Sequence, residues 1–341
     1  MSGESDIGGG AARTRLAWLD ALKGVGIVAV VAGHVWWRGP LRDAVYVFHM
    51  PLFFMVSGYT AHVMPWRTLL PRLGRSLLLP FLCFAALLLA ADFAIEGWRG
   101  VRPIFASWID GAATILLATE TLRGPFTILW FIPGLLLARL AWNALMGPGR
   151  EPMDRMVLAG MMLVAALALL VHYEGGRSPF AILAVPAALL MIWAGALWRS
   201  LGRPRPMIAL LLAPFAAAAL IWFRPVNMKL GDLGWPGLSL AGAVAITVVL
   251  AMLLRRAPAL LVSGAASLGR ASLVIMYVHV AVVHYLAPYL PQAALFLAAL
   301  AGSWALDWLI RRTRVTRLLL RGEAWAPRPA ADRDGAKPLL R

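Results

Sequence analysis

Long apolar stretches separated by short polar segments cover most of the chain. About 20 consecutive apolar residues cross the hydrocarbon core of a bilayer, and ten stretches approach this length. Their continuous hydrophobicity is typical of membrane helices and differs from the alternating pattern of an outer-membrane barrel. The pattern therefore predicts an all-α, polytopic integral membrane protein with about ten transmembrane helices. The predicted spans are approximately residues 16–37, 44–64, 77–95, 127–146, 156–173, 179–198, 207–223, 236–254, 271–289 and 293–310.

Composition supports this class of protein. Of the 341 residues, 61% are hydrophobic and 14% are charged, whereas about a quarter of the residues in an ordinary soluble domain are charged. This excludes a soluble globular enzyme. The single cysteine, Cys83, excludes an internal disulfide framework and a cysteine-based metal site, and we expect no metal.

The distribution of positive charge predicts the orientation of the chain. The net charge is +16, with 32 Lys and Arg against 16 Asp and Glu. With ten spans and a cytoplasmic N-terminus, 23 of these cations fall in cytoplasmic segments and eight in external ones, and Lys23 lies within the first span. Cytoplasmic loops carry such an excess of Lys and Arg. We therefore expect a multi-pass protein of the plasma or inner membrane with both termini in the cytoplasm, with the lipid bilayer and not nucleic acid as its charge partner.

One moderately apolar segment, Pro103–Glu120, is not counted as a span. It contains two carboxylates, and counting it would invert the topology of everything that follows. We expect an external, interfacial or re-entrant segment. The predicted organisation is a cytoplasmic N-terminal segment at 1–15, a transmembrane domain at 16–321 and a disordered cytoplasmic tail at 322–341.

The first span carries three ionisable side chains, Asp20, Lys23 and His34. Each costs about 2.5–3.5 kcal/mol or more near a helix centre, which makes an intramembrane charge a functional candidate. Eleven helical steps place Lys23 and His34 within about 20° of each other, so they share one face. Asp20 lies one turn from Lys23 and can pair with it. The alternative is an interfacial ion pair with a snorkelling histidine. Glycines that leave room for substrate or a neighbouring helix are Gly24, Gly26 and Gly33.

The second span places another histidine near the outer membrane surface. His49 is expected to begin this helix, with Pro51 in its first turn, and a short loop brings His49 close to His34. Imidazole is suited to take a proton from a sugar hydroxyl and pass it to a leaving thiolate. Ser57 and Tyr59 could hydrogen-bond substrate, or serve helix packing.

These residues carry a family resemblance. The segments Arg15–Gly24, Gly33-His34 and Phe48–Tyr59 resemble the opening of the acyltransferase-3 family of integral membrane O-acyltransferases, in particular its fucose 4-O-acetylase-like branch. Leu129–Pro133 and Ser267–His279 resemble later segments of the family. The resemblance implies a ten-helix enzyme that moves an acyl group, usually acetyl from cytosolic acetyl-CoA, to a carbohydrate hydroxyl at or beyond the outer face.

The resemblance and the physical pattern together assign candidate roles. In the family, Arg or Lys followed by ten residues and His marks the first helix, and the pair here is Lys23 and His34. An anionic acyl-CoA needs cations at the cytoplasmic face. Each arginine there has an alternative role as a topogenic charge. The candidates for catalysis are His34, Lys23, His49 and Asp20. The candidates for substrate binding are Ser57, Tyr59, Trp130 and His279. The candidates for acetyl-CoA binding are Arg67, Arg72 and Arg75, and the Arg311–Arg314 run can supply further cations.

Several alternatives stay open at the level of sequence. His34 could act as a base or carry the acetyl group itself. The intramembrane Asp, Lys and His residues could instead form the proton relay of a transporter or flippase, and an inert membrane scaffold is a third possibility. The sequence identifies neither the acceptor sugar nor the acyl group. His172 and His284 lie near the outer boundary and are expected to be interfacial.

Overall fold

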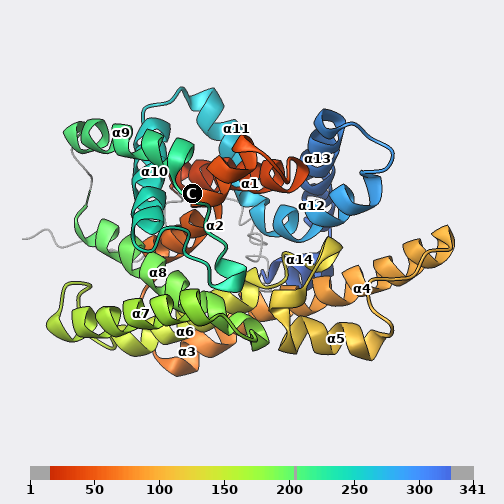
Figure 1. The fold of residues 1–341 in the computed structure, drawn as a ribbon, viewed down its shortest axis with the longest axis horizontal. Helices are drawn as coiled ribbons and strands as arrows, with labels where there is room; N and C mark the ends of the chain where they lie inside the picture. Colours follow the sequence, from red (N-terminus) through yellow and green to blue (C-terminus); the bar gives the residue numbers. More distant parts are fainter. Residues whose placement is uncertain (1–15, 203–205, 324–341) are drawn as a thin grey trace, which may run out of the picture. The chain divides into compact units, whose positions relative to one another are not determined.

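A computed structural model describes residues 16–202 and 206–323 (Figure 1). These residues form helices and loops, with no strand among them, as predicted. The predicted N-terminal segment 1–15 and the predicted tail beyond residue 323 lie outside the described residues.

The chain divides into two compact units, and both are discontinuous in sequence. The first unit comprises Met1–Thr60, Met191–Val226 and Leu233–Ser272. The second comprises Ala61–Leu190, Asn227–Asp232 and Leu273–Arg341. The predicted transmembrane domain at 16–321 contains residues of both units.

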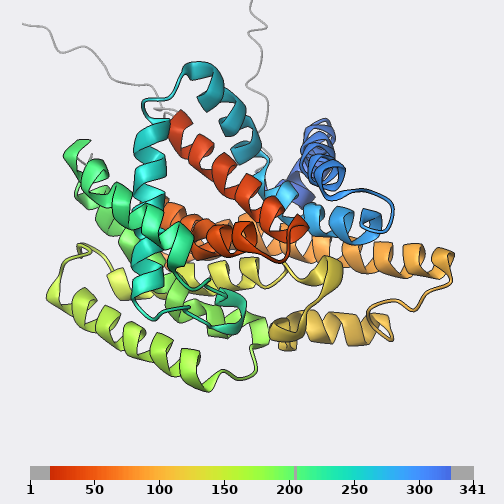
Figure 2. The same cartoon turned by 45° about the horizontal axis from the view of Figure 1, so that its top comes forward.

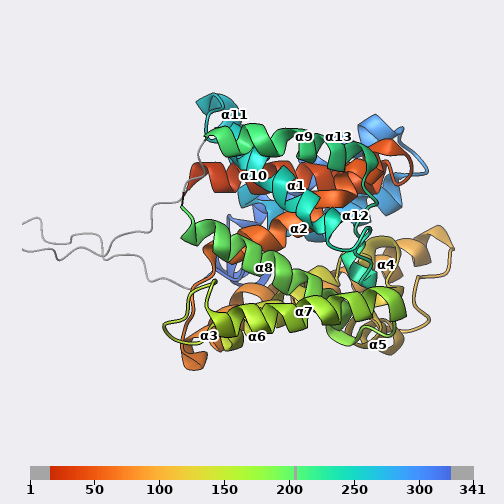
Figure 3. The ribbon, with the colours of Figure 1, turned by 60° about the vertical axis from the view of Figure 1, so that its left-hand side comes forward.

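The first unit is built around α1 and α2. Figure 3 shows these two helices side by side, and they contact each other along their length. The helix α1 also packs against α11 (Figure 2). The residues of α11 fall in a predicted cytoplasmic loop, between the predicted spans 236–254 and 271–289. The helices of this unit are α1 (Ala17–Val35), α2 (Pro40–Thr60), the last part of α8 (Val185–Ser200), α9 (Pro206–Trp222), α10 (Leu238–Leu254) and α11 (Ala259–Arg270).

Glycines bring the backbones of α1 and α11 into contact. A Cβ on Gly24 would lie 1.9 Å from the carbonyl oxygen of Ala265, and a Cβ on Gly269 would lie 1.8 Å from that of Asp20. Small residues permit such close approach between membrane helices. The space beside Gly24 is thus occupied by a neighbouring helix and not by a substrate chain.

The start of α2 differs from the prediction. The helix begins at Pro40, so His49 and Pro51 lie in its middle and not in its first turn. Proline at the first helical position needs no donor, and Pro40 takes this place. Pro51 instead leaves one carbonyl of the preceding turn without its helical hydrogen bond.

The second unit contains the remaining helices. The segment Trp66–Arg99 runs through α3, a π-helical turn and α4. The short α5 measures about 15 Å at 1.5 Å per residue, half the thickness of a bilayer core, which agrees with leaving it out of the spans. The elements are α3 (Trp66–Leu73), η1 (Gly74–Leu78), α4 (Leu79–Arg99), α5 (Trp108–Leu117), η2 (Thr119–Thr121), η3 (Gly124–Phe126), α6 (Phe131–Met146), α7 (Arg155–Glu174), η4 (Pro179–Ala184), the start of α8, η5 (Met228–Leu230), α12 (Ser272–Leu286), α13 (Gln292–Ile310) and α14 (Arg314–Arg321).

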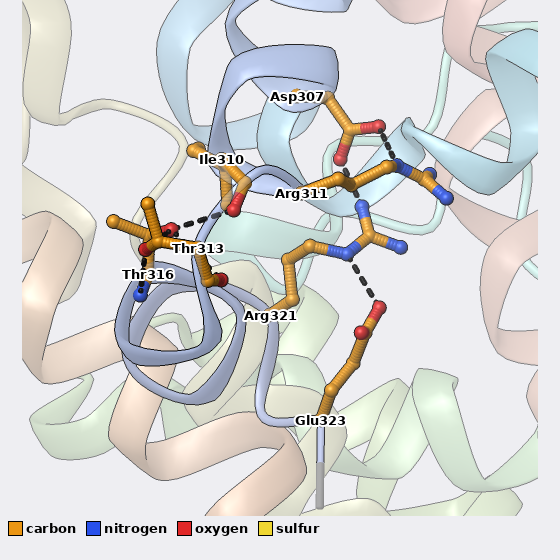
Figure 4. A network of polar contacts seen from close by, with 7 residues as sticks. All are labelled: Asp307, Ile310, Arg311, Thr313, Thr316, Arg321 and Glu323. Atoms are coloured by element: carbon orange, nitrogen blue, oxygen red, sulfur yellow. Dashed lines mark hydrogen bonds and ion pairs between the residues drawn. The ribbon is translucent and has the colours of Figure 1, made fainter. Parts of the chain in front are cut away.

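A buried carboxylate fixes α14 to α13 (Figure 4). Asp307 is 3% exposed, accepts from Arg311 Nε at 2.7 Å and is ion-paired with Arg321, which also bonds Glu323 at 2.7 Å. Thr313 caps α14 by accepting from Thr316 N at 3.2 Å. Arg311, predicted to be available for an anionic donor, is thus already neutralised within the protein.

The predicted helices are present, but the predicted number of spans is not supported. Every predicted span coincides with a helical segment. Within the described residues, six helices are long and apolar enough to cross a membrane, or seven if the broken pair α11 and α12 forms one span. Helices α9 and α10 have 17 residues each, and α2 has 21 residues but carries Arg42, Asp43 and His49. Length and polarity therefore account for the difference from ten.

Candidate active site

The charged pair of α1 is formed as predicted. Lys23 Nζ lies 2.6 Å from Asp20 Oδ1. Asp20 is 5% exposed, and its carbonyl is the one that meets Gly269 of α11. Pairing offsets part of the cost of removing both charges from water. The ion pair therefore sits where α1 and α11 touch.

A tyrosine joins the two histidines of the first unit. The ring of Tyr46 lies 6.3 Å from the ring of His34 and 4.5 Å from that of His49, both edge-on. Tyr46 is held by the Arg42 guanidinium, 4.2 Å above its ring, and its carbonyl accepts from Val226 N at 3.3 Å. The short loop between α1 and α2 thus gathers His34 and His49 around one aromatic ring.

The hydrogen bond of His49 defines its tautomer. His49 is 3% exposed, and its Nδ1 lies 2.7 Å from the carbonyl oxygen of Val45. Because a carbonyl can only accept, Nδ1 carries the proton of the neutral ring and Nε2 is the basic nitrogen. The side chain is therefore oriented as a proton acceptor through Nε2.

An aromatic cluster lies at the opposite end of α1. Tyr59 packs 5.5 Å from Trp18 and 4.9 Å from Trp198, measured between ring centroids. Because α2 runs back along α1, its last turn reaches the beginning of that helix. Tyr59 therefore lies beside Trp18, at the other end of α1 from His34, and Ser57 precedes Tyr59 by two residues in α2.

A cationic cavity of about 650 Å³ opens beside this cluster. Its arginines were not among the candidate site residues predicted from the sequence. Its walls include Trp18, Arg255, Arg256 and Ser263. The Arg255 guanidinium lies 3.8 Å above the Trp18 ring, and its buried Nε has no hydrogen-bond partner. Neither arginine has an acidic partner among the described residues. The cavity therefore combines an aromatic face with two uncompensated cations.

The remaining predicted site residues belong to the second unit. Trp130 is 5% exposed and packs against Phe131 at the start of α6. His279 is fully buried in α12, where its Nδ1 lies 2.6 Å from the carbonyl oxygen of Ile275. The predicted donor cations are all exposed and lie on α3 and η1: Arg67, Arg72 and Arg75. The first unit alone therefore contains Asp20, Lys23, His34 and His49.

One group of side chains in the second unit has the spacing of metal ligands. Atoms of Asp92, Glu96 and His284 lie within 4.8 Å of one another. Protein donors already engage the carboxylates: Tyr285 donates to Asp92 at 2.8 Å, and Arg99 pairs with Glu96 at 3.3 Å. Protein donors thus satisfy both carboxylates, and we propose no metal site here.

Comparison with known proteins decides the family. The sequence model of the acyltransferase-3 family, described as an acyltransferase domain, matches residues 16–310. The chain belongs to this family. It is also 32% identical over 136 residues to the nodulation protein NolL of Sinorhizobium fredii, a match that covers 36% of this chain and 35% of NolL. No solved structure matches.

Membership of the acyltransferase family limits the chemistry of the site. The family match spans both units, from the start of α1 to the end of α13. Together with the apolar helices, it indicates a multi-pass membrane protein with a domain of the acyltransferase-3 family. An acyltransferase needs a donor, an acceptor and a route for one proton, and the first unit supplies basic side chains at one end of α1 and a cationic cavity at the other.

Proposed function

We propose that this protein moves an acyl group, usually acetyl, from acyl-CoA to a carbohydrate hydroxyl, with His34 as general base. The observation that carries the proposal is the arrangement along α1. The cationic cavity beside Trp18 and the paired histidines around Tyr46 lie at opposite ends of this helix. Sixteen helical steps lead from Trp18 to His34, about 24 Å at 1.5 Å per residue. A donor with a long, thin arm suits this separation.

The proposed reaction needs one proton transfer in each direction. The acceptor hydroxyl oxygen attacks the thioester carbonyl while His34 takes its proton. The C–S bond then breaks, and the CoA thiolate leaves and receives the proton from the imidazolium. His49, with Nε2 as its basic nitrogen, orients the hydroxyl or His34. Atoms and charge balance without a metal or redox partner.

The nucleotide end of the donor is assigned to the cavity beside Trp18. Arginine forks bind phosphate oxygens, and a purine ring stacks on an aromatic face. Arg255 and Arg256 supply the cations, and Trp18 supplies the stacking surface. The exposed arginines of α3 and η1, Arg72 and Arg75 among them, remain a second proposed donor site.

Replacing Arg255 with alanine is expected to raise the KM for acetyl-CoA at least about tenfold, because hydrogen bonds between charged groups contribute about 1.5–3 kcal/mol. The effect should shrink at high salt. Arg312→Ala is a matched control, since Arg312 also stacks on a tryptophan, at 3.7 Å from Trp308, but in the second unit. Kinetics of acetyl-CoA consumption measure both variants. An unchanged KM for Arg255→Ala, with a raised KM for Arg75→Ala, would move the donor site to η1.

We further propose that α2, α9 and α10 also cross the membrane and that α11 and α12 form one broken span, which gives ten spans with both termini in the cytoplasm of a plasma or inner membrane. The 23 to 8 distribution of positive charge supports this orientation. Reporter fusions at Arg341 and after Ser200 are expected to read cytoplasmic. An external signal at either position contradicts the ten-span topology.

A further inference from the structure

A second cationic cavity lies in the second unit, at the end of α4. Its volume is about 790 Å³, and its walls include Arg102, Ile104, Phe105, Arg123, Gly124 and His284. A cavity of this size falls in the range of small-molecule sites. None of these residues was a site candidate from the sequence.

Buried hydrogen bonds fix the wall around Ile104. Asp92, which is fully buried, accepts from Ile104 N and from the Tyr285 hydroxyl, both at 2.8 Å. One carboxylate therefore ties the loop after α4 to α12. A buried carboxylate of this kind holds the backbone in one place, because breaking either bond leaves a charge unpaired.

The wall around Arg123 is fixed in the same way. The carbonyl oxygen of Leu122 accepts a hydrogen bond from Lys229 Nζ and another from the Thr127 hydroxyl at 3.2 Å. Gly124 has a φ of +55°, and a Cβ there would lie 2.4 Å from Cδ1 of Ile104. Glycine is thus required where the two walls approach each other.

The cations of this cavity lack acidic partners. Arg102 and Arg123 are exposed and form no ion pair within the part of the chain that is described, whereas neighbouring Arg99 is paired with Glu96. Glu96 also lies 3.7 Å from Nε2 of His284, which orients that ring. The neighbouring ring atoms Cε1 and Nδ1 lie 3.4 and 3.5 Å from the Cβ position of Gly124, at the cavity wall. Three nitrogen-bearing side chains therefore line one cavity without a carboxylate in its wall.

Most of the cavity wall comes from loop residues between two apolar spans. One candidate span ends at Arg99 and the next begins at Gly124, so the loop residues 102–106 lie between them, and His284 of α12 completes the wall. Irregular backbone does not face lipid hydrocarbon, and Arg102 and Arg123 are exposed, so we expect this wall at the aqueous edge of the membrane.

We propose that this cavity binds an acidic carbohydrate through its anionic group, such as a carboxylate. The inference rests on the proposed transferase function, whose acceptor class is a carbohydrate, and adds an acidic sugar as the ligand of this cavity. Arg102 and Arg123 hold the oxyanion through charged hydrogen bonds, and His284 contacts the ring or its hydroxyls. The volume accommodates a sugar unit in addition to the anion.

The test measures binding of glucuronate, with glucose as the neutral control, to the full chain in phosphatidylcholine nanodiscs. Glucuronate is expected to bind, and the double variant Arg102→Ala/Arg123→Ala should weaken binding at least about tenfold. Arg177→Ala, an exposed arginine of the same unit outside the cavity, is the matched control and should not change binding. Ala106→Trp, which fills the cavity and keeps both cations, should also abolish binding.

Three results would overturn the inference: equal binding of glucose and glucuronate, unchanged binding in the double variant, or displacement of glucuronate by phosphatidylglycerol added to the nanodiscs, which would assign the cavity to lipid. Acetyl-CoA consumption is followed in the same samples. If wild-type protein consumes acetyl-CoA but lacks selectivity for glucuronate, only the ligand proposed for this cavity is wrong. If it consumes no acetyl-CoA, the transferase function itself fails.

Discussion

Replacing His34 with alanine is expected to lower acyl transfer by about 10²–10⁴-fold, the usual contribution of general acid–base catalysis. The protein should still fold, because His34 is only half-buried and lies in the last turn of α1. Residual transfer would reflect donor and acceptor held together without a base. Single-turnover measurement of acetyl transfer, compared with membrane yield of the variant, checks both statements.

The matched control for this variant is His62→Ala. His62 is exposed and follows the end of α2, so its loss should leave transfer unchanged. Near wild-type transfer by His34→Ala would contradict the proposed mechanism. The variant Lys23→Ala tests whether the Asp20–Lys23 ion pair serves folding or catalysis. A poor membrane yield would assign the pair to folding. A normal yield with lost transfer would assign it to the reaction.

Gly269→Ala is expected to prevent folding of the first unit. The added Cβ would lie 1.8 Å from the carbonyl oxygen of Asp20, and this backbone atom cannot move without separating α1 from α11. Overpacking of flexible side chains costs about 1–3 kcal/mol, and a clash with backbone exceeds that range. Thermal unfolding in detergent and the yield of monodisperse protein measure the effect.

Gly264→Ala serves as the control for this prediction. It lies on the same helix, and nothing stands within 4 Å of the position of its Cβ. Because alanine is the better helix former by about 0.5–1 kcal/mol, this variant should match or exceed the wild type in stability. Equal stability of the two variants would show that α1 and α11 do not meet as described.

The positions of the apolar helices could be predicted from the sequence because hydrophobicity alone defines them. The predicted span 16–37 became α1 (Ala17–Val35), and the span 236–254 became α10 (Leu238–Leu254). The helix α11 was not predicted. Its residues include Ser263, Gly264 and Gly269, which give it little bulk, and it lies between arginines that resemble a loop. The same small residues let it approach α1 closely.

The candidate site was only partly predictable for a similar reason. The Asp20–Lys23 pair and the short loop beside His34 depend on local spacing, which a sequence displays. The place of Tyr46 between the histidines depends on how α2 packs against α1, and the place of Arg255 above Trp18 depends on how helices far apart in the chain pack. Arginine at a helix end also looks the same in sequence whether it sets topology or binds a ligand. No periodicity distinguishes those roles.

The most direct test of the central claim uses purified wild-type protein in liposomes with acetyl-CoA labelled in the acetyl group. The account predicts that CoA thiol is released and that label appears on a carbohydrate acceptor, with both signals lost in His34→Ala and retained in His62→Ala. Proton flux across the liposome membrane without CoA release or acetyl transfer would contradict the account and identify the intramembrane charges as part of a transporter.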